Sequence, residues 1–224
     1  MKKIAKTLIA AGVMLAAGTV TAEMMDDVKP YVGLDYYHAW MKGAKGKVNG
    51  ITGWDFDFTK SAPKSYPGAT IYAGAKLTEF FGLELGADWS MRKKKMTTDD
   101  DGDKIKFQTK RTAMHADIVL SAPLNECYEL LGFVGAGWVK PKTTVSETDA
   151  VTGEITSITP KIKAKTIARL GLGVNYMINE TIGFRTKVGW ENTHRLKATI
   201  PNTNLSLKLF KDTVSLSLGA FVRW

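Results

Sequence analysis

The feature that most constrains this chain is an alternation of apolar and polar residues that recurs in segment after segment. It is plainest in TVSLSLGAFVRW at residues 213–224, where every even-numbered residue is apolar. A period of two places successive side chains on opposite faces of an extended strand. The segment therefore predicts a β-strand with one apolar face and one mixed face.

Alternating segments of this kind predict eight strands. They are 31–41, 67–77, 81–91, 105–120, 128–139, 162–178, 181–192 and 205–224. The connections between them are alternately short and long. The long, polar ones are residues 42–66, 92–104, 140–161 and 193–204. Outer-membrane barrels have an even number of strands, short periplasmic turns and long outer loops. We therefore predict an all-β fold, an eight-stranded antiparallel up-and-down transmembrane β-barrel with both chain ends on the periplasmic side. A soluble β-sandwich also alternates, and the loop asymmetry favours the barrel.

The first 22 residues have the pattern of a secretory signal peptide. A basic start precedes an apolar run at about residues 8–17, and small residues close the segment at Ala22. The run is shorter than the roughly 20 residues that a membrane-spanning helix needs. We therefore expect residues 1–22 to be cleaved and residues 23–224 to form one barrel domain. The longest later apolar run, residues 130–139, includes three glycines, so strands would have to span the membrane.

Four tryptophans stand at matching places in the alternation. Each lies on the apolar parity, 8 to 10 residues from the start of its strand and just before a long connection. At ~3.3 Å per residue and a tilt near ~40°, this spacing is roughly 20–25 Å, about the height of the apolar band of an outer-membrane barrel. The predicted membrane-interface girdle consists of Trp40, Trp89, Trp138 and Trp190.

The opposite parity is small or charged, and it predicts the barrel interior. An eight-stranded barrel is just wide enough inside for side chains to fill it. Ionised groups enclosed there have to pair with one another. The predicted lumenal ionic network is Glu84, Asp88, Arg111, His115, Asp117, Arg169, Arg185, Lys187 and Glu191. The same face also carries Asp35, Thr70, Lys76, Asn175 and Arg223.

Three stretches carry a resemblance to a known family. IYAGAKLTEFFGLELGADW at 71–89, RLGLGVNYMINETIGFRTKVGWENT at 169–193 and the terminal aromatic strand resemble the OmpA-type barrel and its small opacity-porin relatives. The resemblance implies a barrel in the outer membrane of a Gram-negative cell envelope, with an acid–base cluster in its lumen. Glu84 matches the family's lumenal glutamate, and Arg185 matches its lumenal arginine. The resemblance also implies that Val222 and Trp224 end a strand whose aromatic terminus the barrel-assembly machinery recognises.

Catalysis and metal binding have little support in the sequence. Neither the His-x-Ser pattern of a lipid-A deacylase barrel nor a nucleophile elbow is present. His115 beside Asp117 is compatible with an acid–base pair, although a lumenal hydrogen bond explains the two residues better. The acidic run Asp99–Asp103 lacks the EF-hand spacing. We expect no enzyme activity and no cofactor, and leave open whether this run binds a divalent ion.

Basic residues gather beside the outer ends of the predicted strands, in a chain of formal net charge +9. The densest run is Arg92, Lys93, Lys94 and Lys95, and Lys140 and Lys142 lie after a later strand. Such side chains are charge partners for anionic headgroups. We expect them to contact lipopolysaccharide phosphates, and a plain solvated rim is the alternative. Nucleic acid is not expected as a partner in this compartment.

Together these features predict a non-enzymatic protein of the cell outer membrane. It would support envelope integrity as a monomer and present four surface loops for contact or adhesion to a host or surface ligand. One alternative is a narrow channel, a porin or small-molecule carrier that uses the lumen. A second is a membrane-embedded lipid-modifying enzyme.

Changing the terminal aromatic residue is expected to impair assembly. We predict that Trp224→Asp, or a few charged residues added after Trp224, lowers the amount of inserted barrel because the recognised aromatic end is lost or covered. The measurement is the fraction of the protein in outer membranes that shows heat-modifiable gel migration. Equal insertion of both variants and the unchanged chain would contradict the assembly signal.

Overall fold

The computed structural model describes residues 28–41, 47–51, 54–57, 64–98, 102, 104–149, 151–159, 161–162, 164–192, 196–199, 206–210 and 212–224. The predicted signal peptide, residues 1–22, lies outside them. No helix among the described residues has the length and apolar character needed to cross a membrane. The strands are β1 (Lys29–Met41), β2 (Lys47–Ile51), β3 (Trp54–Asp57), β4 (Ser65–Lys76), β5 (Phe81–Ser90), β6 (Lys93–Thr98), β7 (Lys104–Pro123), β8 (Tyr128–Thr148), β9 (Ile155–Ile158), β10 (Lys161–Ile162), β11 (Lys165–Met177), β12 (Ile182–Asn192), β13 (Leu196–Thr199), β14 (Ser206–Phe210) and β15 (Thr213–Arg223).

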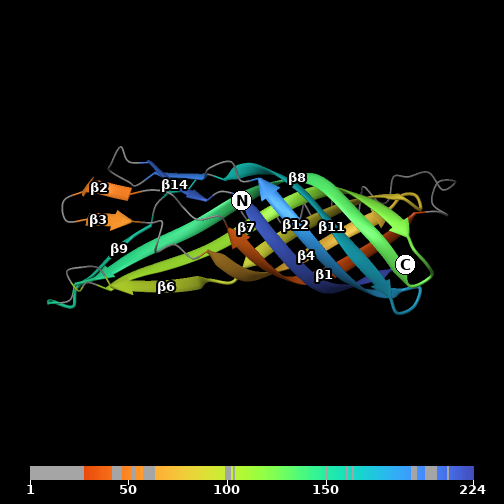
Figure 1. Ribbon diagram of the computed structural model, residues 1–224, viewed down its shortest axis with the longest axis horizontal. Coiled ribbons are helices and arrows are strands. Elements are labelled where there is room, and N and C mark those ends of the chain that lie inside the picture. Colours follow the sequence, from red (N-terminus) through yellow and green to blue (C-terminus); the bar gives the residue numbers. More distant parts are fainter. Residues whose placement is uncertain are drawn as a thin grey trace, which may run out of the picture.

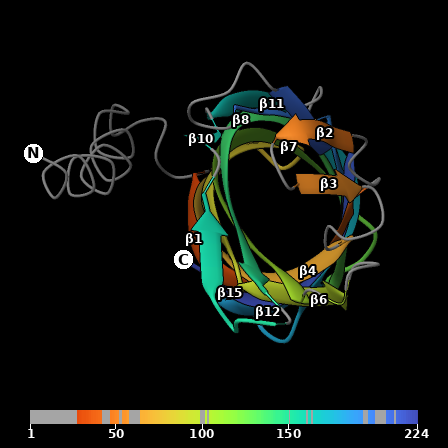
Figure 2. The same cartoon turned by 90° about the vertical axis from the view of Figure 1, so that its left-hand side faces the viewer.

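Eight of these strands close into one antiparallel barrel (Figure 1), which Figure 2 shows end-on. The order around the ring is β1–β4–β5–β7–β8–β11–β12–β15, and β15 pairs with β1 to complete it. The closing ladder runs from Tyr31↔Arg223 to Met41↔Thr213. Closure gives backbone donors and acceptors partners within the ring, as hydrocarbon requires. The prediction of an eight-stranded up-and-down barrel is confirmed.

Short turns join the barrel strands at one end. Asn125 Oδ1 accepts hydrogen bonds from the backbone N–H groups of Cys127 (2.9 Å) and Tyr128 (2.8 Å). Asn179 Oδ1 accepts equivalent bonds in the turn before β12, and such side-chain turns are why asparagine favours these positions. Trp224 N–H donates to the carbonyl of Pro30 at the same end (3.1 Å). Short turns mark the periplasmic side of an outer-membrane barrel, so the start of β1 and the end of β15 lie on that side.

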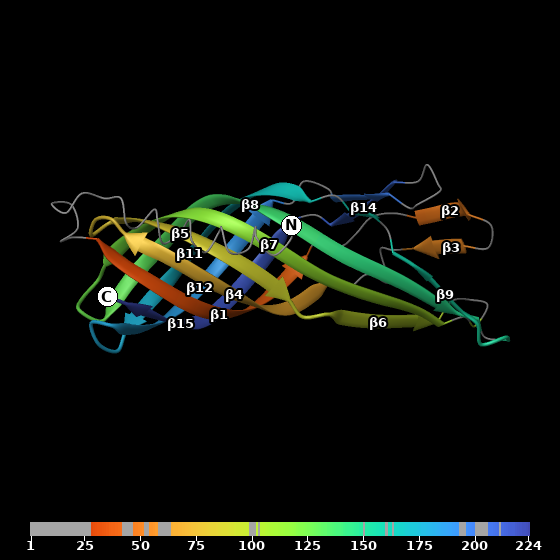
Figure 3. The same ribbon diagram turned by 180° about the vertical axis from the view of Figure 1, so that it is seen from behind.

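The long connections differ from the sequence prediction, because strands fill much of their described length. β7 has 20 residues and β8 has 21, about twice the 10 residues of β5. Both continue past the barrel, where β6 pairs with β7 and β9 with β8 (Figures 1 and 3). We call the part of β6–β7–β8–β9 beyond the barrel the projecting sheet. The sequence prediction placed β7 in a strand, at residues 105–120, but placed β6, the outer part of β8 and β9 in loops. The outward positions of β6 and of the outer part of β8 include lysines rather than a run of apolar residues.

A defined turn links β8 to β9 at the tip of the projecting sheet. Asp149 Oδ1 accepts hydrogen bonds from the backbone N–H groups of Thr152 (2.7 Å) and Val151 (2.8 Å). These bonds, with that of Thr152 first, hold the pKa of Asp149 below its usual range. Gly153 follows with a φ of 70°, which glycine adopts without a steric cost.

Side chains are distributed inside out compared with a water-soluble protein. Leu172 is 71% exposed and Leu218 60% exposed on the outer surface. Asp35 and Glu84 are 1% and 3% exposed in the interior. Soluble proteins bury leucine and expose carboxylates. The distribution is that of a barrel whose outer face meets hydrocarbon.

The interior also holds large aromatic side chains, which corrects the prediction of a face that is only small or charged. Tyr31, Tyr72 and Phe221 pack with Met177 in a buried cluster. A Cβ atom on Gly33 would overlap the Tyr72 ring, so glycine in β1 makes room for tyrosine in β4. These rings occupy inward positions of their strands, where the sequence predicted only small or charged side chains.

Two glycines of β8 give a matched test of this packing. A Cβ on Gly135 would overlap the Asp117 side chain and the Ala116 carbonyl, whereas one on Gly132 has no neighbour nearer than 3.9 Å. Gly135→Ala is therefore expected to lower the free energy of unfolding by about 1–3 kcal/mol, the usual cost of overpacking. Gly132→Ala is expected to be neutral or stabilising. Urea unfolding in detergent micelles measures both, and an equal effect of the two substitutions would contradict the close packing.

Candidate functional site: the charged interior and the outer rim

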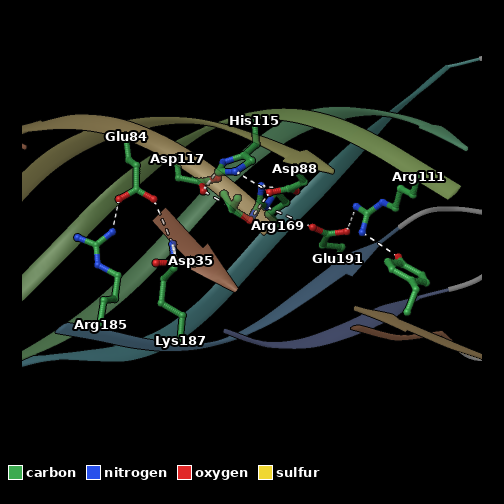
Figure 4. Close-up of polar contacts among 12 residues, drawn as sticks. Asp35, Glu84, Asp88, Arg111, His115, Asp117, Arg169, Arg185, Lys187 and Glu191 are labelled. Carbon is green, nitrogen blue, oxygen red and sulfur yellow. Dashed lines mark hydrogen bonds and ion pairs between the residues drawn. The ribbon is translucent and has the colours of Figure 1, made fainter. Parts of the chain in front are cut away.

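The interior nearer the periplasm holds a chain of charged and polar side chains. Lys76 on β4 contacts Glu129 on β8, and Asn175 Nδ2 donates to Glu129 Oε2 (2.8 Å). Arg185 Nε donates in turn to Asn175 Oδ1 (2.9 Å) and Arg185 Nη1 to Glu84 Oε2 (2.5 Å). Figure 4 shows Glu84 between Arg185 and Lys187. These contacts link β4, β5, β8, β11 and β12 through the lumen.

Glu84 contacts two of these cations, Arg185 and Lys187. Lys187 Nζ lies 3.2 Å from Glu84 Oε1 and 3.4 Å from Asp35 Oδ2, and Tyr31 donates its hydroxyl to Glu84 (3.1 Å). Strands β5 and β12, which carry Glu84 and Arg185, stand opposite each other in the ring order. The Glu84–Arg185 pair therefore crosses the barrel interior.

Aromatic rings enclose Arg185 as well. Its guanidinium carbon lies 4.6 Å from the ring centroid of Tyr72 and 5.1 Å from those of Tyr31 and Phe221. Cation–π contacts of this kind strengthen when the site is desolvated. Arg185 is thus held in the lumen by a carboxylate, an amide and three rings.

The interior nearer the outer surface is organised around His115. Its Nδ1 lies 2.9 Å from Asp117 Oδ2 and its Nε2 lies 3.5 Å from Asp88 Oδ1. Arg169 lies 3.8 Å from Asp88, 3.9 Å from Asp117 and 3.6 Å from Glu191. Figure 4 shows the imidazole ring beside these carboxylates, with Arg169 below it.

We call the charged and polar side chains of the interior, from Lys76 and Glu129 to Arg111, the charged column. Arg111 lies at its outer end. It contacts Glu191 and donates from Nη1 to the Tyr66 hydroxyl (2.9 Å). Both Arg111 and Glu191 are buried. The ion pairs of the column are therefore nearly balanced, with six carboxylates and five permanent cations among the described residues. They are Asp35, Glu84, Asp88, Asp117, Glu129 and Glu191 against Lys76, Arg111, Arg169, Arg185 and Lys187.

The structure places all nine residues of the predicted network inside the barrel and brings them into contact with one another or with Asp35. Glu129 was not among the predicted residues, although it lies on the same side of β8 as the buried Leu131. The tyrosines that accept or donate hydrogen bonds in the column were not predicted either. Their positions in the inward-facing alternation of each strand would have identified all of these residues. Glu129, however, stands at the start of its strand, where the predicted boundary was uncertain.

The four predicted girdle tryptophans all lie on the outward parity. Trp40, Trp89 and Trp138 are 46–62% exposed, and Trp190 is partly exposed. Trp138 is not at a strand end, contrary to the prediction, because β8 continues to Thr148. It lies instead at the barrel rim, where pairing of β8 with β11 ends at Val139. At the periplasmic end, the rings of Tyr128 and Tyr176 lie 5.0 Å apart on the outer surface.

The basic run Arg92–Lys95 does not form one patch. Strand alternation turns Lys93 inward, where its Nζ donates to Ser65 Oγ (3.2 Å), and Lys95 pairs with the buried Phe107 on β7. Arg92 and Lys94 face outward, and Arg92 Nη1 donates to Gln108 Oε1 (3.4 Å). The predicted lipopolysaccharide contacts are therefore split between two faces of the projecting sheet.

Other predicted features lie wholly or largely outside the described residues. Of the acidic run 99–103, only Gly102 is described, and His194 is not. Trp224 is described, and the residue is 64% exposed. In the part of the chain that the structure covers, no group of three or more His, Cys, Asp or Glu side chains is arranged to hold a metal ion.

Comparison with known proteins identifies the class of this barrel. The family described as outer membrane protein beta-barrel domain matches residues 8–220 of the chain. The chain belongs to this family and is an outer-membrane protein. Among proteins of curated function, none matches the chain in sequence.

Solved structures agree with the family. The chain resembles OprG from Pseudomonas aeruginosa, with a TM-score of 0.55 and 13% identity over 88% of this chain and 96% of OprG. It also resembles Ail, the attachment invasion locus protein of Yersinia pestis, with a TM-score of 0.51 and 15% identity over 88% of this chain and 99% of Ail. Its resemblance to Neisserial surface protein A has a TM-score of 0.51 and 13% identity over 87% of this chain and 97% of that protein. At these identities the likeness concerns the fold alone.

The interior column makes a direct prediction about stability. Glu84→Gln keeps the shape of the side chain but leaves Arg185 and Lys187 without their shared carboxylate. Removing one partner of a buried ion pair costs about 3–5 kcal/mol, so we expect a loss of this size in the free energy of unfolding. Urea unfolding of the folded barrel in micelles measures it. Glu180→Gln in an exposed turn is the control, and equal stability of both variants would contradict a structural role for the column.

Proposed function

We propose that this protein is a closed, non-enzymatic barrel that supports the integrity of the outer membrane and presents its outer strands for contact at the cell surface. The charged column carries this proposal. The Glu84–Arg185 pair joins strands on opposite sides of the ring, and Arg185 is packed among aromatic rings. A lumen filled in this way stabilises the barrel and opposes the passage of ions.

The outer surface of the barrel supports the same role. We assign Trp40, Trp89, Trp138 and Trp190 to the outer membrane interface, where an indole ring has apolar and polar surroundings at once. Val222 and Trp224 end the strand that closes the ring, and we assign to them the signal for the barrel-assembly machinery. The exposure of Trp224 is compatible with such recognition.

The placement of His115 argues against the lipid-modifying enzyme. Its side chain has no exposed surface, and both ring nitrogens face carboxylates. A general base must come within hydrogen-bond reach of its substrate, and a lipid outside the barrel cannot reach this imidazole. A place between two carboxylates in the interior fits a structural role for this histidine.

The channel remains the alternative function, and conductance decides between the two. We expect the purified chain to show no steady openings in a planar lipid bilayer, because the Glu84–Arg185 pair and its neighbours occlude the lumen. Steady openings of the unchanged protein would contradict the proposal. Glu84→Ala combined with Arg185→Ala is expected to raise conductance, whereas Glu126→Ala combined with Arg92→Ala, which removes the same charges outside the lumen, is expected to leave it unchanged.

A further inference from the structure

The outward face of the projecting sheet is strongly basic. Strand alternation brings lysines from β6, β7 and β8 to this one face, and the described residues of the face include no acidic side chain. We call it the basic face. It consists of Arg92, Lys94, Lys104, Lys106, Lys110, Lys140 and Lys142.

The arrangement of these charges is unfavourable for the isolated protein. Lys110 on β7 stands directly opposite Lys142 on β8, and Lys140 belongs to the neighbouring outward pair. Like charges that face each other across a ladder are destabilising. The ion pairs among the described residues involve no lysine of the basic face. An anion bound from outside would relieve this repulsion.

The position of the basic face selects a membrane component as that anion. Exposed Trp138 pairs with exposed Met114 at the barrel rim. The next outward pair along the strands contains Lys140, and the one after it is Lys110↔Lys142. Two residues of strand span roughly 7 Å, and the polar headgroup layer of a bilayer is roughly 5–8 Å deep on each side. The lysines therefore begin where the apolar belt ends.

The face is also held in a fixed shape. On the opposite side of the same strands, Ile105, Phe107 and Val145 are 4% exposed or less. This buried apolar layer keeps the outward lysines on a continuous, paired sheet rather than on separate loops. Binding to a prearranged surface costs less conformational entropy than binding to a loop.

We propose that the basic face is a multivalent binding site for the phosphate groups of lipopolysaccharide in the same leaflet of the outer membrane. The proposal rests on the function proposed above, since it requires the barrel to stand in that membrane with the projecting sheet outside. It replaces the sequence prediction, because Arg92 and Lys94 belong to the site and Lys93 and Lys95 do not. A soluble polyanion would meet the same charges but would not need them to begin at the level of Trp138.

The test uses the mature chain refolded in detergent micelles. Lys110→Gln combined with Lys142→Gln removes the facing pair, and Lys29→Gln combined with Lys64→Gln removes two exposed lysines elsewhere. The probes are purified lipopolysaccharide, the same lipopolysaccharide after enzymatic removal of phosphate, and heparin as a soluble polyanion. Heat-modifiable gel migration first establishes that each variant is folded.

We expect the facing-pair variant to bind lipopolysaccharide roughly 30-fold more weakly than the unchanged chain at low salt, from the usual contribution of a lysine beside an anionic membrane surface. The control variant should bind as the unchanged chain does, and dephosphorylated lipopolysaccharide should bind poorly to all three. Equal binding by the two variants, or equal binding of the dephosphorylated probe, would overturn the proposal. So would tighter binding of heparin than of lipopolysaccharide. Failure of the proposed function itself would appear separately, as steady conductance of the unchanged barrel.

Discussion

The ladder between the first and last barrel strands is the interaction on which the rest of this structure depends. From Tyr31↔Arg223 to Met41↔Thr213, the pairing of β1 with β15 turns an open sheet into a cylinder. In hydrocarbon an unpaired strand edge would leave several kcal/mol of unsatisfied hydrogen bonding at each residue. Closure also separates two environments, so that leucines on one parity meet lipid and carboxylates on the other are enclosed.

Enclosure in turn determines what the interior can contain. A lumen of eight strands has room for side chains but little for bulk water, and an ion without a partner there is costly. The interior contains nearly balanced charges, each in contact with an opposite one, together with tyrosines whose rings pack beside them. Glycines such as Gly33 and Gly135 leave space for these large groups. Strands on opposite sides of the ring are thereby linked, and we propose that the same contacts obstruct conduction.

Beyond the membrane the constraint changes, and the sequence of the two longest strands changes with it. β7 and β8 keep their alternation, but their outward residues include lysines beyond Trp138, which we assign to the membrane interface. Their inward residues become apolar, as at Phe107 and Val145, because the column of paired charges has ended below them. One pair of strands therefore joins a lipid-facing barrel wall to a basic sheet.

Alternation, the unequal connections and the tryptophans on the apolar parity were sufficient to predict the class of fold and most of the charged side chains in its interior, although not Glu129. These properties are local, since parity follows from the geometry of a single strand. The partners of those charges were not predictable, because Glu84 meets Arg185 and Arg111 meets Glu191 only through strand order, register and closure. The same holds for the lysines of β6, β7 and β8. They lie far apart in sequence, and the pairing of strands alone brings them to one face while it turns Lys93 and Lys95 to the other.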